Sequence, residues 1–121
     1  MRFMQVQGFS VRADRQVAFQ RWLIENDERI RGAYPPGTEY GGCYASVFSS
    51  EKSMGDSVWI TVLDSYAALD TIAAAGKDPA HPLAAVQAEL VGFFDPNPAA
   101  PYSNVLLKSF LDATVVDVPI E

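Results

Sequence analysis

The centre of the chain most constrains the fold, because residues 57–63 (SVWITVL) form the clearest strand pattern in the sequence. β-Branched and aromatic side chains occupy nearly every position, which favours an extended, half-buried strand. A polar turn at residues 50–56, which contains Gly55, separates it from a second strand pattern at residues 38–49. Two strand patterns joined by a polar, glycine-containing turn predict a β-hairpin.

A helical pattern precedes the hairpin, over residues 14–32. At about 100° per residue, one stripe of such a helix contains Phe19, Trp22, Leu23, Asn26, Ile30 and Ala33. Gly32 suits the end of this helix, because glycine readily adopts the positive φ found there. The prolines of the following Tyr34-Pro35-Pro36-Gly37 segment cannot continue it.

A second helical pattern follows the hairpin and is broken in two. Residues 66–75 form the first part, which Gly76 closes. Pro82 suits the first position of a new helix over residues 82–94, because the nitrogen of an N1 residue needs no partner. We therefore expect two helices in place of one on this side of the hairpin.

Strand patterns at residues 2–11 and 104–111 complete the order β-α-β-β-α-β. This order predicts an α+β, ferredoxin-like sandwich, with an antiparallel four-stranded sheet and both helices, the second of them broken, on one face. The 121 residues suffice for one hydrophobic core. We expect a single ferredoxin-like domain over residues 1–121, in which residues 113–121 form a short C-terminal strand or an arm.

The charge and composition argue against two classes of partner. The net charge is −6, and the Lys and Arg residues form no basic stripe of the kind that binds nucleic acid or an anionic membrane surface. No run of about 18 apolar residues predicts a transmembrane helix, and the N-terminus lacks the apolar core of a signal peptide. With Cys43 as the single cysteine, these features predict a cytoplasmic protein without disulfides.

The two faces of the predicted sheet differ in composition, because alternate residues of a strand point to opposite sides. One set is aliphatic or small and is assigned to the side of the helices: Met4, Val6, Cys43, Ala45, Val47, Val58, Ile60, Val62, Val105 and Leu107. The other set mixes aromatic and hydrogen-bonding groups and is assigned to the opposite side: Phe3, Gln5, Gln7, Phe9, Tyr40, Tyr44, Ser46, Phe48, Trp59, Thr61, Leu63, Leu106, Lys108 and Phe110. A β-bulge at Gly8 or at Gly41-Gly42 would reverse the assignment.

Two helices cover only one face of such a sheet, so the aromatic face needs another cover. We expect a second copy of the chain to pack on it and form a homodimer. The polar groups of this face would each cost about 1–3 kcal/mol if buried without a partner, and they therefore suit a pocket that holds water or a ligand. The wet edge of an ordinary dimer interface would show the same composition, and this alternative stays open.

Six residues are the candidate ligand contacts. The aromatic members would contact a small aromatic ligand, and the lysine would orient an anionic group. The asparagine lies in the apolar stripe of the first helix, where its amide either bonds neighbouring backbone or points past the sheet edge into a pocket. For the aromatic residues, an ordinary place in the core is the alternative. The six are Tyr40, Tyr44, Trp59, Lys108, Gln7 and Asn26.

His81 and Cys43 are the single histidine and the single cysteine. One histidine cannot build a multi-histidine metal site, and we expect neither a metal nor another cofactor. The position of His81 before Pro82 is typical of a helix cap or a loop. Nothing near Cys43 in the sequence would lower the pKa of its thiol, which is typical of a buried and unreactive cysteine.

The element order, the length and the run Trp59…Asp64-Ser65-Tyr66-Ala67-Ala68-Leu69-Asp70 resemble the dimeric α/β-barrel superfamily of ferredoxin-like proteins, over residues 1–112. This superfamily includes stress-responsive barrel domains, antibiotic-biosynthesis monooxygenase-like proteins and heme-degrading monooxygenases. The resemblance implies a homodimer with a cavity in each barrel. It implies no single reaction, because one fold serves many functions.

Two enzymatic branches of the superfamily are relevant. Its cofactor-independent monooxygenases oxidise polycyclic aromatic substrates with Tyr, Trp and Asn groups around a hydrophobic cavity, and Tyr40, Tyr44, Trp59 and Asn26 are similar in kind. We therefore expect a small-molecule-binding homodimeric barrel, for which a metal-free oxygenase or isomerase acting on an aromatic metabolite is one candidate activity. A non-catalytic ligand-binding or assembly module is the alternative.

The heme-degrading branch fits the sequence less well. Its members pair an asparagine on the first strand with a tryptophan and a helix histidine. Here the first strand carries Gln5 and Gln7, and His81 precedes a proline. These departures argue against heme degradation.

Overall fold

The computed structural model describes residues 2–51 and 53–110. The expected strand or arm at residues 113–121 lies outside the described residues. The fold is α+β, and its strands and helices follow the expected ferredoxin-like order. The elements are β1 (Phe3–Phe9), η1 (Ala13–Arg15), α1 (Gln16–Glu25), α2 (Asp27–Ala33), β2 (Thr38–Ala45), β3 (Ser57–Leu63), α3 (Ala68–Lys77), α4 (Pro82–Val91) and β4 (Ser103–Lys108).

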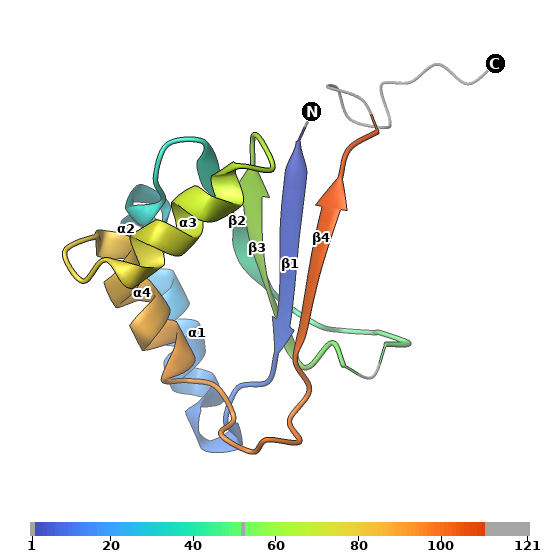
Figure 1. The fold of residues 1–121 in the computed structure, drawn as a ribbon. Helices are drawn as coiled ribbons and strands as arrows, with labels where there is room; N and C mark the ends of the chain where they lie inside the picture. Colours follow the sequence, from blue (N-terminus) through green and yellow to red (C-terminus); the bar gives the residue numbers. More distant parts are fainter. Residues whose placement is uncertain (1, 52, 111–121) are drawn as a thin grey trace.

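The strands form one four-stranded sheet in the order β2-β3-β1-β4, and all neighbouring pairs are antiparallel. Figure 1 shows the helices gathered on one side of the sheet, with β4 at the edge farthest from them. The four-stranded antiparallel sheet and the broken second helix confirm the predicted fold class.

Asn26 interrupts the long helix that the sequence predicts before the hairpin, so that α1 and α2 are separate. Its side-chain Nδ2 donates to the carbonyl oxygen of Trp22 at 2.8 Å. Asparagine weakens a helix because its amide competes for backbone groups. At the start of α4, Pro82 occupies the first turn, and Nδ1 of His81 accepts a hydrogen bond from the backbone N–H of Leu83 at 3.0 Å. The expected capping role of His81 is therefore confirmed.

The assignment of the two faces to helix side and open side was wrong for β1, β3, β4 and the first half of β2; beyond Gly42, Cys43 lies on the helix side as expected. Along β3, Ser57, Trp59, Thr61 and Leu63 are buried under the helices, whereas Val58, Ile60 and Val62 point away from them. Alternation shows which residues share a face but not which face the helices cover. The aromatic side chains of the sheet lie on the helix side, where Trp59 packs against Trp22 of α1 and Phe9 packs against Phe19.

A β-bulge in β2 changes which residues share a face. Tyr40 pairs with Thr61, but the register shifts by the next pair, Gly42 with Ile60. Gly42 has φ +105°, a conformation that glycine adopts without strain. Beyond the bulge, Cys43 pairs with Trp59 and packs against the core on the helix side. Tyr44 therefore points to the opposite side from Tyr40.

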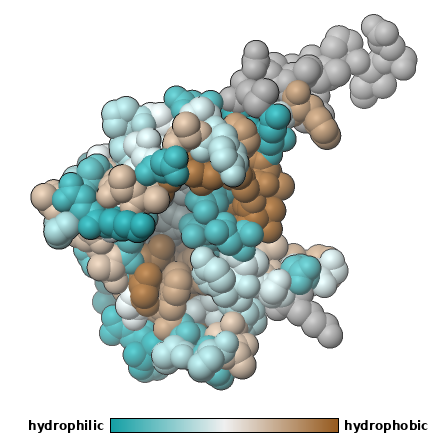
Figure 2. Space-filling view, viewed as in Figure 1, coloured by the Kyte–Doolittle hydropathy of each residue, from teal (hydrophilic) through white to brown (hydrophobic). Residues whose placement is uncertain are grey.

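The face of the sheet that carries no helix is aliphatic along β1, β3 and β4, and we call it the open face. Those strands contribute Met4, Val6, Val58, Ile60, Val62, Val105 and Leu107, and the edge strand β2 adds Glu39 and Tyr44. Val105 and Leu107 on β4 are 45% and 46% exposed. Figure 2 shows apolar surface gathered over the strands at the right, where β4 lies. Among the described helices, none has the length and apolar character needed to cross a membrane.

Candidate functional site

A pocket of about 270 Å³ lies between the helix side of the sheet and the helices α3 and α4. In Figure 2 it is the hollow between the helices at the left and the strands. Strand residues and Tyr34 supply most of its hydrogen-bonding groups, and α3, α4 and Phe94 supply most of its apolar wall. The lining residues are Gln5, Gln7, Phe9, Tyr34, Trp59, Thr61, Ile72, Leu83, Val86, Gln87, Leu90, Val91, Phe94 and Tyr102.

The sheet side of the pocket is polar because β1 and β3 place polar residues opposite one another. Gln5 pairs with Thr61, and Gln7 pairs with Trp59. Directly opposed residues of antiparallel strands have Cβ atoms about 4.5–5.5 Å apart. The two glutamines therefore stand beside the threonine hydroxyl and the indole on one surface, which we call the polar floor of the pocket.

Tyr34 completes the polar floor from the segment between α2 and β2. The indole N–H of Trp59 donates to the Tyr34 hydroxyl at 2.7 Å, and the Thr61 hydroxyl lies 3.3 Å from the same oxygen. Burial raises the pKa of Tyr34, and the hydrogen bonds from Thr61 and Trp59 offset only part of this effect. The phenol is therefore neutral at physiological pH and available as a hydrogen-bond donor.

The two glutamines are held from the β4 side. Nε2 of Gln5 donates to Oδ1 of Asn104 at 3.1 Å, and Nε2 of Gln7 donates to the Tyr102 hydroxyl at 3.5 Å. Within residues 2–51 and 53–110, neither glutamine Oε1 accepts a hydrogen bond. The carbonyl oxygens of both side chains are therefore available acceptors at the pocket wall.

The pocket carries no formal charge in its described lining, which contains no Asp, Glu, Lys, Arg, His or Cys. Its hydrogen-bonding groups are hydroxyls, amides and one indole. Such groups can orient a molecule and donate to or accept from it, but at neutral pH they are poor general bases. In the described part of the chain, no group of three His, Cys, Asp or Glu side chains is placed to hold a metal ion.

The structure brings only two of the six expected ligand contacts into this pocket, Gln7 and Trp59. Tyr40 packs on Trp59, with ring centroids 4.8 Å apart, but its exposed edge belongs to a shallower groove beside β2, which it shares with Tyr44. Lys108 lies near Phe3 at the far end of β1 and β4, in a separate hollow. The expectation that Tyr40, Tyr44, Trp59 and Lys108 surround one void was wrong, because of the bulge and the distance along the strands.

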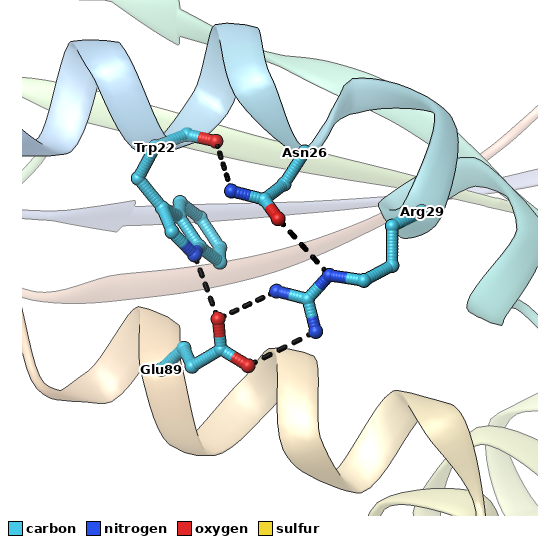
Figure 3. Close-up of polar contacts among 4 residues, drawn as sticks. All are labelled: Trp22, Asn26, Arg29 and Glu89. Atoms are coloured by element: carbon cyan, nitrogen blue, oxygen red, sulfur yellow. Dashed lines mark hydrogen bonds and ion pairs between the residues drawn. The ribbon is translucent and has the colours of Figure 1, made fainter.

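Asn26 belongs to a polar cluster that joins α1 and α2 to α4, outside the pocket (Figure 3). The Asn26 side chain accepts from Nε of Arg29, and Arg29 pairs with Glu89 of α4 through both of its terminal nitrogens. Glu89 also accepts from the indole N–H of Trp22 at 2.9 Å. Hydrogen bonds from Arg29, and then from Trp22, hold the pKa of Glu89 below its usual value. The cluster fixes α4, which forms one wall of the pocket, against the first two helices.

Five residues that line the pocket were not among the six expected ligand contacts: Tyr34, Thr61, Gln5, Gln87 and Tyr102. Gln5 and Thr61 shared a set with Trp59 in the strand alternation, which was the available signal. Tyr34 stands among helix-ending residues, and Tyr102 follows a proline-rich loop. Their places depend on how those segments pass over the sheet, which no local pattern specifies.

No protein-family model matches the sequence, and no curated protein does. A solved structure with a similar fold is that of the heme-degrader MhuD from Mycobacterium tuberculosis, with two hemes bound in its active site. The TM-score is 0.50 and the identity 16%, and the match covers 92% of this chain and 98% of MhuD. The two proteins share a fold. At this identity, the likeness to MhuD shows the ferredoxin-like fold alone.

Proposed function

We propose that this protein binds a small, uncharged aromatic molecule in the pocket between the sheet and α3 and α4. The observation that carries the proposal is the pocket itself: a cavity of about 270 Å³ with an apolar helix wall and a polar floor. Ligand sites of proteins are typically concave and mainly apolar, with a few placed polar groups, and measure about 300–1,000 Å³. This cavity lies just below that range and suits a molecule of one ring or of two fused rings.

The charge distribution supports a neutral ligand. The described lining has no ionisable acid or base other than tyrosine. An anion would lose its hydration without gaining a cationic partner, which is costly in a partly buried site. The net charge of −6 adds a further barrier to anions. Lys108, which the sequence suggested as an anchor for an anionic group, does not line this pocket.

The heme that MhuD binds does not fit these residues. Of the side chains that hold heme iron, His, Cys, Met and Tyr, the described lining offers only tyrosine. Burial raises the pKa of Tyr34, which opposes the phenolate that iron would need. No Lys or Arg of the described lining could pair with the heme carboxylates. The proposal therefore involves no heme.

Ligand-observed saturation-transfer NMR tests this proposal with three bicyclic probes: naphthalene, isoquinolin-1(2H)-one and 1-naphthoate. We expect the two neutral probes to bind and the anion to bind at least about 10-fold more weakly. Val91→Trp, at the pocket wall, should abolish binding, whereas Val17→Trp on the exposed side of α1 should not. Equal binding of the anion, or equal loss in both variants, would contradict the proposal.

We also propose that the protein is a homodimer in which the open faces of two sheets pack together. Two exposed aliphatic residues of β4, Val105 and Leu107, continue the apolar surface of β1 and β3. A contiguous aliphatic surface of this kind on a sheet marks an interaction site. In a two-fold dimer the same patch of each chain packs on its copy, so the aliphatic side chains of one open face would meet those of the other. The ligand pocket lies on the opposite side of each sheet and would remain accessible.

Sedimentation at micromolar concentration tests the dimer. Val6→Lys places a charge at the centre of the open face and should give a folded monomer. Ile24→Lys, at a position on α1 that is 79% exposed, is the matched control and should leave the dimer intact. A wild-type monomer of 13.2 kDa would contradict the proposal.

Catalysis at this pocket, by a metal-free oxygenase or isomerase of an aromatic metabolite, is the second candidate. The observation that favours it is the neutral Tyr34 hydroxyl, which is fixed by Trp59 and can donate to a ligand carbonyl. A donor aimed at an oxygen that gains negative charge in the transition state accelerates such reactions. Enzyme-dependent oxygen uptake or isomerisation with an aromatic ketone, lost in Tyr34→Phe, would support catalysis; binding without turnover would leave a ligand-binding protein.

A further inference from the structure

The polar floor offers a hydrogen-bond donor and hydrogen-bond acceptors, and their arrangement sets which hydrogen-bonding groups the facing edge of a ligand needs. This inference rests on the proposed function of the same pocket. The indole N–H of Trp59 can only donate, so the Tyr34 oxygen accepts it, at 2.7 Å. Tyr34 and Thr61 together carry two hydroxyl hydrogens, and the contact between them uses one. One hydroxyl hydrogen of the pair therefore remains for a ligand.

Burial favours Tyr34 over Thr61 as the hydroxyl that faces the ligand. Thr61 is only 3% exposed, whereas Tyr34 is half-buried and lines the same pocket. If Thr61 donates to Tyr34, the Tyr34 oxygen accepts from Thr61 and Trp59 with its two lone pairs. Every group is then satisfied, and the Tyr34 hydrogen is the one left over. Its raised pKa keeps this hydrogen in place at neutral pH.

The glutamines supply the complementary acceptors. Asn104 and Tyr102 hold the Nε2 atoms of Gln5 and Gln7, which leaves both Oε1 atoms without a described partner. Gln5 is directly opposite Thr61 in the sheet, and the Thr61 hydroxyl lies 3.3 Å from the Tyr34 hydroxyl, so the Gln5 acceptor and the Tyr34 donor belong to the same polar floor. Across the pocket, Leu83, Val86 and Leu90 of α4 offer only apolar surface.

We propose that the pocket selects a neutral, planar ring compound that carries a carbonyl acceptor and an N–H or O–H donor on the same edge. The carbonyl oxygen accepts from Tyr34, the donor bonds the Oε1 of Gln5 or Gln7, and the ring lies against α4. Cyclic amides and hydroxylated aromatic ketones belong to this chemical class. Trp59 is a positioning residue, since it acts on the ligand through Tyr34.

The test compares isoquinolin-1(2H)-one, which has the required edge, with naphthalene, which lacks it. Tyr34→Phe should lower the affinity for the cyclic amide about 5- to 10-fold, which corresponds to the loss of one hydrogen bond, and should leave the affinity for naphthalene unchanged. Tyr66→Phe removes the hydroxyl of a tyrosine that is 66% exposed and does not line the pocket, and it should change neither affinity.

Wild-type protein gives an independent measurement should Tyr34→Phe fail to fold. N-methylation of the cyclic amide removes its donor and should weaken binding at least about 5-fold. If naphthalene binds, but neither N-methylation of the cyclic amide nor Tyr34→Phe weakens binding, the selection of the ligand edge is wrong and the proposed function stands. If no neutral probe binds to wild type, both are wrong.

Discussion

Truncation of Trp59 tests whether the aromatic face of the sheet packs under the helices. Trp59 is 3% exposed, stacks near Tyr40 and Trp22, and donates its indole N–H to Tyr34. Trp59→Ala removes a buried aromatic ring and leaves a cavity, which should lower the free energy of unfolding by about 3–5 kcal/mol. Trp59→Phe keeps most of the ring but loses the hydrogen bond, which should cost about 0.5–1.5 kcal/mol.

His81→Ala is the comparison variant, since it removes only the capping hydrogen bond to the Leu83 N–H, worth about 1 kcal/mol. At about 4 °C per kcal/mol for a domain of this size, Trp59→Ala should lower Tm by about 12–20 °C and His81→Ala by about 4 °C. Circular dichroism melts and urea titrations measure both. Equal losses would refute the packing of Trp59 in the core.

The oligomeric state of Trp59→Phe should match that of wild type, because Trp59 lies on the opposite side from the open face.

Three further experiments test separate parts of the structure. Glu89→Gln removes the pairing with Arg29 that lowers the folded-state pKa of Glu89. The stabilisation from this exposed pair, up to about 1 kcal/mol, is present above the unfolded-state pKa of about 4.3 and is lost as pH falls through the lower folded value. Urea titrations should therefore show a wild-type advantage at pH 7 that shrinks as the pH falls below the unfolded-state pKa. Burial raises the pKa of Cys43 to about 12, so iodoacetamide at pH 8 should modify the native thiol far more slowly than the urea-unfolded one, and equal rates would contradict its burial. Gly42→Ala forces alanine to φ +105° and should cost more than about 1 kcal/mol, whereas Gly32→Ala, with open space around its Cα, should be neutral or stabilising.

The element order was predictable from the sequence because hydrophobic period and breaker residues are local signals. Residues 57–63 became β3 without a change of boundary, and Pro82 begins α4 as expected. The interruption at Asn26 was not predicted, since a 3.6-residue stripe continues through it. Its amide finds the carbonyl oxygen of Trp22 and bonds to Arg29, which the apolar pattern does not show.

The candidate site was predicted in part. Alternation correctly placed Gln7, Trp59 and Thr61 on one face, but the side that the helices cover depends on tertiary packing. Tyr44 was wrongly grouped with Tyr40 and Trp59, because the bulge at Gly42 puts Tyr44 on the opposite side of the sheet from them. Tyr34 was missed because its role depends on a 2.7 Å contact with a residue 25 positions away.

Binding of a small neutral molecule over the polar floor can be followed directly by two-dimensional ¹H–¹⁵N NMR during titration with isoquinolin-1(2H)-one. We expect the resonances of the Trp59 indole N–H and of the Gln5 and Gln7 side-chain amides to shift with one common Kd. The indole N–H of Trp22, which is bonded to Glu89 outside the pocket, should stay in place. Shifts confined to the groove beside β2, or no shift at the Trp59 indole, would contradict it.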